Sequence, residues 1–480
     1  MNIKKSGGYE NQIKPVETEQ NRLFSNRDLL LLIWPLIVEQ LLNVTVGMAD
    51  TLMVATLGEA AISGVSLVDS INVLLFGIFA ALATGGAVVA SQYIGRNDLK
   101  QANRTAVQLI YTMLALSAFI TFVFVVFASP ILRVIFGEVE ADVMAQSKKY
   151  FTLTMISLPA MAMYNAVAAL FRAQGNSKAS MVASVITNVI NIGGNAICIF
   201  GLHMGVEGVA IPTVISRFAA CVLLLYWMLQ EKHYEGKEAI SIKNTFKDKF
   251  DFELTKKVLK IGVPNGLENS VFQIGKILVL SLIATFGTSA IAANAAANVI
   301  ASIEVLPASS INFAVLTVVG QCVGFGNEKQ TVYYTKKMMV IAFASMFVWN
   351  VPLLLFCYKI LGFYHMSSDA TNLAWLMAMI HGTMGILIWP WSFTMPNALR
   401  ATGDAAFTMW VSLISMWMLR VGLSYAFKYT QMFGLLPALG LAPVYGAVGV
   451  WVAMIIDWIL RSTLFVTRFA GGKWKTKKVI

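Results

Sequence analysis

The chain has 480 residues, of which 57% are hydrophobic and 13% are charged. Soluble proteins typically carry about 25% charged residues, and a soluble chain of this length would need polar surfaces for roughly three domains. The composition therefore excludes most soluble enzymes and nucleic-acid readers. The formal net charge of +11 does not by itself indicate an acidic partner, because the basic residues cluster between apolar runs.

The first 28 residues are polar, and no apolar core precedes Leu29, so no cleavable signal peptide is predicted. The first apolar run is expected to direct membrane insertion itself. The four cysteines and four histidines show no metal-ligand spacing, which favours packing roles for them and predicts no metal centre of their own.

Apolar segments long enough to cross a bilayer recur along the rest of the chain. A hydrocarbon core about 30 Å thick needs roughly 20 apolar residues per helix. Twelve segments meet this length, and the sequence predicts an all-α integral membrane protein. The predicted spans are 29–56, 62–86, 105–128, 149–171, 179–201, 208–229, 259–285, 290–320, 338–361, 371–399, 406–427 and 446–467.

The positions of the basic residues predict the orientation of these spans. With the N-terminus inside, 27 of the 36 Lys and Arg residues fall in inner segments, five in outer loops and four within spans. This bias predicts a multi-pass protein of the cell membrane with both termini in the cytoplasm. No basic patch is interleaved with aromatic residues, so no nucleic-acid partner is expected.

The two halves of the chain repeat each other. Matching residues recur at an offset of 229 or 228 positions: Pro35 and Pro264, Glu39 and Glu268, Gly95 and Gly324, Arg172 and Arg400, Gly175 and Gly403. The repeat predicts a tail (1–28), a six-helix lobe (29–229), a charged linker (230–258), a second six-helix lobe (259–468) and a basic tail (469–480). Since six is even, both lobes have the same orientation and are related by a pseudo-twofold axis along the membrane normal, as in many secondary carriers.

One single motif and three paired motifs carry a family resemblance. They are M-A-D-T-L-M-V-A-T-L-G at 48–58, S-Q-Y-I-G at 91–95 with G-Q-C-V-G at 320–324, R-A-Q-G-N at 172–176 with R-A-T-G-D at 400–404, and G-V-E-G-V at 205–209 with G-A-V-G-V at 446–450. With these motifs the chain resembles the multidrug and toxic compound extrusion (MATE) family along nearly its whole length. The resemblance implies two lobes arranged in a V and export of cationic and amphipathic organic compounds in exchange for Na⁺ or H⁺. We expect it to act as a monomer in the lipid bilayer.

Acids within membrane spans cost about 2.5–3.5 kcal/mol on insertion scales, so each one is a functional candidate. Six acids qualify: Glu39, Asp50, Asp69, Glu268, Glu304 and Asp457. Glu39 and Asp50 share one face of the first helix, since eleven residues span about three turns.

The resemblance implies that Asp50 forms a cation-coupling site with Asn191, Asn195 and Thr213. One carboxylate, two amide oxygens and a hydroxyl are suited to Na⁺, because small hard ions prefer oxygen ligands. Some branches of the family have an aspartate at the position of Asn195, and these are associated with proton-linked rearrangement. Its absence here weighs against a two-carboxylate proton relay, although H⁺ carried by Asp50 alone remains the alternative.

The remaining polar residues within spans are candidates for substrate binding or gating. Glu39 and Glu268 each follow a proline by four residues, and each is either a substrate or gating carboxylate or a partly hydrated acid stabilised by the helix dipole. Asp69 and Asn72 share a face of the second helix, where they either line the first-lobe cavity or serve only in packing.

Cations within spans also need an explanation. Lys276 lies near Gln273 on the seventh span and is expected either to pair with an acid (Glu268, Glu304 or Asp69) or to act on substrate, by competing with a cationic compound or recognising an acidic one. Asp457 and Arg461 have the spacing of a structural ion pair within one helix. Arg217 and Arg420 either face the pore or extend toward the membrane surface.

Two other functions are weighed against the exporter. A flippase of lipid-linked saccharide precursors, or an exporter of anionic metabolites, would favour a basic cavity. An integral membrane enzyme lacks support, because the sequence has no phosphate-binding loop, metal motif or Ser/His pairing. No cofactor is expected besides the coupling ion.

Overall fold

The computed structural model describes residues 22–137, 139–230, 233–234, 237–243, 248–429, 446–477 and 479–480. Within them, eleven helices are long and apolar enough to cross a membrane, and a twelfth span results if one bent pair counts as a single crossing. The bent pair, Ala141–Ile156 and Leu158–Ala173, turns by 46° where Pro159 begins the second helix. The prediction of an all-helical, multi-pass membrane protein is confirmed.

The first half of the chain forms a bundle that we call the N-lobe. Its helices are α1 (Asn26–Ala55), α2 (Glu59–Gly95), α3 (Leu99–Val126), α4 (Ala128–Phe136), α5 (Ala141–Ile156), α6 (Leu158–Ala173), α7 (Ser177–Ala196) with a π-helical extension η2 (Ile197–Gly201), and α8 (Glu207–Gln230).

The second half forms the C-lobe. Its helices are α9 (Phe252–Ala284), α10 (Thr288–Glu304), α11 (Leu306–Gly324), α12 (Glu328–Gly362), α13 (Ser368–Trp389), the π-helical turn η3 (Pro390–Thr394), α14 (Met395–Ala401), α15 (Ala405–Ser415), the π-helical turn η4 (Met416–Leu423), α16 (Ser424–Tyr429), α18 (Gly446–Ala470) and the short 3₁₀ helix η7 (Lys473–Thr476). The G-V-E-G-V and G-A-V-G-V motifs repeat at an offset of 241, which predicts about 13 extra residues before the last helix of the second half. Residues 430–445 of that stretch lie outside the described residues.

Helix starts repeat between the lobes as well. Asp98 caps α3 by accepting from the Gln101 backbone N–H, and Asn327 caps α12 by accepting from that of Gln330. A side-chain acceptor at this position satisfies a backbone donor that has no partner within the helix. The two caps lie at the repeat offset of 229 residues, so the duplication preserved local start signals as well as apolar runs.

One helix is continuous in the first repeat and broken in the second. The N-lobe helix α2 runs without a break, whereas its counterpart is divided at Val305 into α10 and α11. Pro307 lies in the first turn of α11, and Ile78 occupies its repeat position in α2. Because proline cannot donate a backbone hydrogen bond within a helix, its presence in only one repeat accounts for the break.

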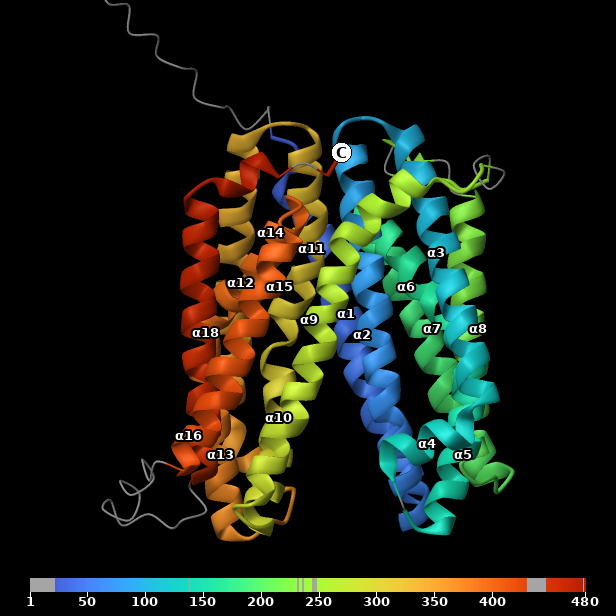
Figure 1. Cartoon of the computed structure of the whole chain (residues 1–480), viewed down its shortest axis with the longest axis vertical. Helices are drawn as coiled ribbons and strands as arrows, with labels where there is room; N and C mark the ends of the chain where they lie inside the picture. Colours follow the sequence, from blue (N-terminus) through green and yellow to red (C-terminus); the bar gives the residue numbers. More distant parts are fainter. Residues whose placement is uncertain are drawn as a thin grey trace, which may run out of the picture.

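The two lobes meet at one end of the molecule and diverge toward the other, which gives the V shape in Figure 1. We call the end where they meet the closed end; it lies where the C-terminus is marked. There α2 packs along α9 and α11. A Cβ added to Gly85 would lie 2.4 Å from the Val258 carbonyl oxygen of the other lobe, so only glycine allows this approach.

The linker and the C-terminal tail both pack against the bundle. Ile240 and Ile242 of the linker are fully buried, and Arg104 of α3 pairs with Asp251 at 3.3 Å, just before α9 begins at Phe252. The second lobe thus begins its helix inside the stretch expected as linker. Residues 1–21 of the predicted N-terminal tail lie outside the described residues.

Candidate functional site

The N-lobe brings together the four residues of the predicted cation-coupling site. Asn195 of α7 donates to the Asp50 carboxylate of α1 at 2.7 Å and lies 3.5 Å from the Asn191 amide oxygen. Asn191 in turn donates to the Thr213 hydroxyl of α8 at 2.9 Å. Three helices therefore contribute to one connected polar group, and a spacing of four residues puts both asparagines on one face of α7.

The oxygens of this group fit a small hard cation. The Asn195 amide oxygen is fully buried and has no hydrogen-bond partner among the described residues. A buried acceptor without a partner is costly, and a bound cation or water would satisfy it. Together with the Asp50 carboxylate, the Asn191 amide oxygen and the Thr213 hydroxyl, it provides the oxygen ligands that Na⁺ prefers.

A second acid lies in the same lobe. Asp69 of α2 accepts hydrogen bonds from Asn72 at 3.1 Å and from the Tyr150 hydroxyl at 3.3 Å. Arg217 of α8 donates to Ser157 at 2.8 Å and interacts electrostatically with both Asp50 and Asp69. This part of the N-lobe therefore combines the Asp50 and Asp69 carboxylates with the Arg217 cation.

Glu39 and Glu268 both form buried ion pairs, which corrects the expectation of partly hydrated helix-start acids. Glu39 is 3% exposed and pairs with Arg172 at 3.1 Å, while Glu268 is 6% exposed and pairs with Arg400 at 2.6 Å. The pairing repeats because both members of each pair repeat in the sequence. With both acids engaged by arginines, the geometry favours a structural role over direct contact with substrate.

The ion pair expected between Asp457 and Arg461 is replaced by other contacts. Asp457 accepts a short hydrogen bond from Ser415 of α15, and Arg461 lies 3.9 Å from Glu268 of α9. Although i,i+4 spacing allows a pair within α18, both side chains point to neighbouring helices instead. The two residues therefore connect α18 to the rest of the C-lobe.

Lys276 is not paired with any of its three expected partners. Glu268 is bound by Arg400, Glu304 forms a short buried contact with His381, and Asp69 lies in the other lobe with Tyr150. Among the described residues, no carboxylate lies within 4.0 Å of the Lys276 amine. The expectation of an ion-paired lysine is therefore wrong.

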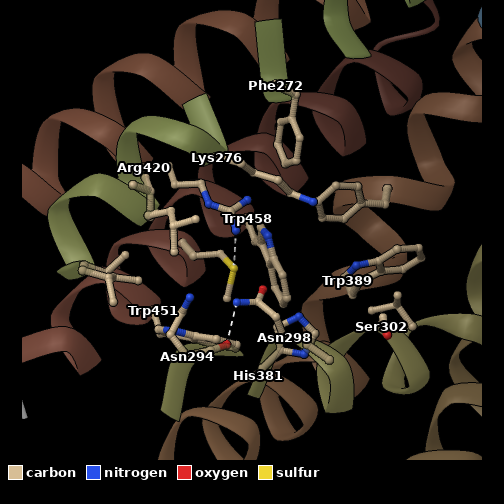
Figure 2. Close-up of a pocket in the computed structure, with 18 residues that line it drawn as sticks. Phe272, Lys276, Asn294, Asn298, Ser302, His381, Trp389, Arg420, Trp451 and Trp458 are labelled. Atoms are coloured by element: carbon tan, nitrogen blue, oxygen red, sulfur yellow. Dashed lines mark hydrogen bonds between the residues drawn. The ribbon is translucent and has the colours of Figure 1, made fainter. Parts of the chain in front are cut away.

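Lys276 instead lines a C-lobe cavity of about 450 Å³, together with Arg420 and several aromatic residues. Figure 2 shows Lys276 and Arg420 among the residues that line this cavity, with Trp389, Trp451 and Trp458 in the same close-up. Gln273 does not line this cavity. We call it the C-lobe cavity.

The paired glutamine motifs interlock at the closed end. Gln92 of the N-lobe donates to the Ala401 carbonyl of the C-lobe at 2.7 Å, and Gln321 of the C-lobe donates to the Ala173 carbonyl of the N-lobe at 2.8 Å. Each glutamine thus binds the R-A-x-G motif of the opposite lobe. The contacts join the two lobes symmetrically at the end where they meet.

These features together define a helical membrane transporter built from two repeats. The MatE family model matches residues 35–197 and 264–426, one match in each lobe. The chain belongs to the MatE family of secondary transporters, and it is not an enzyme.

Similar chains and structures cover nearly its whole length. It is 25% identical to the probable multidrug resistance protein NorM of Thermotoga maritima over 95% of this chain and 94% of that protein. It is 27% identical to the uncharacterized transporter YisQ of Bacillus subtilis over 94% of this chain and 95% of that one. A MATE family transporter in an outward-facing conformation superposes with a TM-score of 0.82 at 19% identity, covering 94% of this chain and 96% of that one.

Sequence reasoning missed two kinds of site residue. It did not pair Glu39 with Arg172 or Glu268 with Arg400, although the repetition of all four was visible. It also left open whether Arg420 faces the pore or the membrane surface, and treated His381 only as a packing residue. No pattern in the sequence could bring Arg420 next to Lys276, because 144 residues and a helix-packing angle separate them.

Proposed function

We propose that the protein is a secondary active antiporter that exports amphipathic organic compounds, organic cations among them, in exchange for Na⁺ entering at Asp50. The observation that carries the proposal is the connected group formed by Asp50, Asn195, Asn191 and Thr213, with one buried amide oxygen unpartnered. Family membership and the names of similar proteins, several of them called probable multidrug resistance proteins, support export of drugs.

Sodium fits this group better than a proton does. A proton needs only one basic oxygen, whereas here two asparagine side chains and a threonine hydroxyl form one hydrogen-bonded group with a single carboxylate. Such a shell satisfies a metal ion that prefers oxygen ligands. Exchange with a proton at Asp50 is the alternative, and the experiment below separates the two.

We further propose that the closed end faces the cytoplasm of the cell and that the protein acts as a monomer. The lobes at 29–229 and 259–468 move against each other, so that substrate has access from one side of the membrane at a time. The basic linker and the C-terminal lysines lie at this end (Figure 1), in agreement with the excess of Lys and Arg in cytoplasmic segments. Breaking the contacts of Gln92 and Gln321 would let the two lobes separate at this end and allow substrate to enter from the cytoplasm.

Transport in liposomes tests the coupling. The full-length protein is reconstituted into liposomes, and the liposomes are loaded with ethidium. An inward Na⁺ gradient and a pH gradient are then applied in separate experiments. We expect efflux with the Na⁺ gradient and little with the pH gradient. Asp50→Asn removes the only carboxylate of the group and is expected to abolish gradient-driven efflux.

Binding of ²²Na⁺ to the purified protein provides a readout that does not depend on the choice of drug. Wild type should bind the ion, while Asp50→Asn should not; Glu59→Gln, at an exposed helix start, is the matched control. Full Na⁺-driven transport by Asp50→Asn would refute the assignment, and efflux driven by the pH gradient alone would replace Na⁺ with H⁺.

A further inference from the structure

The C-lobe cavity has the size and lining of a small-molecule site. Its volume of about 450 Å³ lies within the range of roughly 300–1,000 Å³ typical of such sites. Aromatic rings form much of its wall, and Trp389 stacks on Phe393 with ring centroids 4.8 Å apart. Such a wall suits a flat, apolar body.

Two cations enter this cavity side by side. The Lys276 amine lies 5.5 Å and the Arg420 guanidinium 5.3 Å from the centroid of the same ring, Phe272. Two like charges around one ring repel each other. The repeat counterparts of the two cations in the N-lobe are the uncharged residues Gly47 and Ile192.

The acids nearest to these cations are engaged elsewhere. Glu304 is bound by His381, and Asp457 is bound by Ser415, while neither lies within 4.0 Å of Lys276 or Arg420 among the described residues. The Arg420 side chain contacts the Met454 sulfur and interacts with Asp457 only from a longer distance. The positive charge of the cavity is therefore not neutralised by contact with the protein.

Backbone irregularity and an unsatisfied donor mark the same place. Arg420 lies on the π-helical turn η4, and turns of this kind inside α-helices are frequent at functional sites. The indole N–H of Trp458, which also lines the cavity, is buried with no hydrogen-bond partner among the described residues. A ligand oxygen that reached this indole N–H would satisfy it, and Trp458 lines the same cavity as Lys276 and Arg420 (Figure 2).

We propose that the C-lobe cavity binds an amphipathic organic anion. Its acidic head group, a carboxylate or a related oxyanion, accepts from Lys276, Arg420 and the Trp458 indole N–H, and its aromatic body packs against Trp389, Trp451 and Phe393. This site rests on the proposed export function and extends the exported compounds to anions. Charged donors are effective here because hydrogen bonds between opposite charges are about twice as strong as neutral ones.

A matched pair of fluorescent probes tests the charge of the ligand. Dansylglycine carries a carboxylate and dansylcadaverine an amine on the same aromatic group. Energy transfer from tryptophan to the dansyl group reports binding to the purified full-length protein, without any ion gradient. We expect dansylglycine to bind at least about tenfold more tightly than dansylcadaverine, which corresponds to about 1.4 kcal/mol.

Substitutions locate the site. Lys276→Gln and Arg420→Gln should each weaken dansylglycine binding about tenfold or more, since each removes a charged donor. Lys276→Arg should retain binding, and Lys276→Glu should reverse the preference toward dansylcadaverine. Lys359→Gln is the matched control, because this exposed lysine lies over Phe356, outside the cavity. Equal affinity for both probes, or unchanged affinity in both glutamine variants, would overturn the proposal.

Two further arms keep the result interpretable. Asp50→Asn should bind dansylglycine normally, so loss of ion coupling and loss of the anion site are separate outcomes. Competition distinguishes two sources of the same chemistry: displacement by indole-3-acetate identifies a soluble amphiphile, and displacement by phosphatidylglycerol identifies a lipid headgroup. Failure of both to displace the probe would count against the site.

Discussion

The N-lobe and the C-lobe share a fold but differ in the charge of their interiors. In the N-lobe, Arg217 interacts electrostatically with Asp50 and Asp69, whereas Lys276 and Arg420 of the C-lobe cavity have no carboxylate within 4.0 Å in the part of the chain that the structure describes. At the repeat offsets, the four residues of the coupling group correspond to apolar residues: Val279, Leu419, Leu423 and Met454. Two of these, Val279 and Met454, line the C-lobe cavity.

The comparison separates what the duplication preserved from what it changed. The glycines at the closed end, the glutamines that join the lobes and the buried Glu–Arg pairs are present in both halves, because each stabilises the shared scaffold. The polar residues inside the two lobes differ. Helix packing tolerates substitutions at these positions when neighbouring side chains compensate for the change in volume and polarity. In our proposals, one scaffold holds an ion-coupling site in one lobe and an anion site in the other.

The largest expected difference concerns the buried ion pairs. Glu268→Gln leaves two buried cations, Arg400 and Arg461, without their carboxylate, whereas Glu39→Gln leaves only Arg172. Removing one partner of a buried pair typically costs about 3–5 kcal/mol. We expect Glu268→Gln to lower the thermal midpoint of the purified protein more than Glu39→Gln does. The double variant Glu268→Gln/Arg400→Gln should recover part of the loss, and equal effects of the two single variants would contradict the asymmetry.

Copying a C-lobe residue into the N-lobe should remove ion binding. Asn195→Leu places the counterpart residue Leu423 into the coupling group and deletes the unpartnered oxygen. Removing a polar group that interacts with a charge costs about 1.5–3 kcal/mol. This cost predicts a roughly ten- to hundredfold weaker affinity for ²²Na⁺. Leu423→Asn, the reverse change, should leave ²²Na⁺ affinity within about twofold; a gain of a second ion would show that the C-lobe position is equivalent.

Alanine substitutions of the matching glycines at the closed end should have similar effects in the two lobes. A Cβ at Gly95 would lie 2.0 Å from the Gln321 carbonyl oxygen, and one at Gly324 would lie 1.9 Å from that of Gln92. Overpacking costs about 1–3 kcal/mol, so Gly95→Ala and Gly324→Ala should each raise opening, and with it maleimide labelling of the buried Cys322, by about fivefold or more. Cys322→Ser gives the background, and Gly193→Ala, with open space around it, is the matched control.

The smallest effect is expected for the glutamines. Gln92→Ala and Gln321→Ala each remove one hydrogen bond between the lobes, worth about 1 kcal/mol. The two variants should raise Cys322 labelling by similar factors, and by less than the glycine variants do. A large effect of one glutamine alone would show that the closed end is asymmetric.

Patterns in the amino-acid sequence were enough to establish the membrane class and the repeat. The length of an apolar segment and the positions of glycines, prolines and helix caps affect only the local structure. They can therefore be predicted from sequence, as the matched caps at Asp98 and Asn327 illustrate. Family resemblance added the selection of Asp50, Asn191, Asn195 and Thr213, and the structure showed them in contact.

Only the tertiary structure decided the partners of the charged residues. Whether Arg461 pairs within its helix or with Glu268 depends on how α18 packs against α9, and the i,i+4 spacing holds in either case. Likewise, Lys276 and Arg420 lie beside one ring because η4 and α9 approach each other. The sequence shows which side chains are charged. Helix packing determines whether each charge has an oppositely charged neighbour or lines a cavity without one.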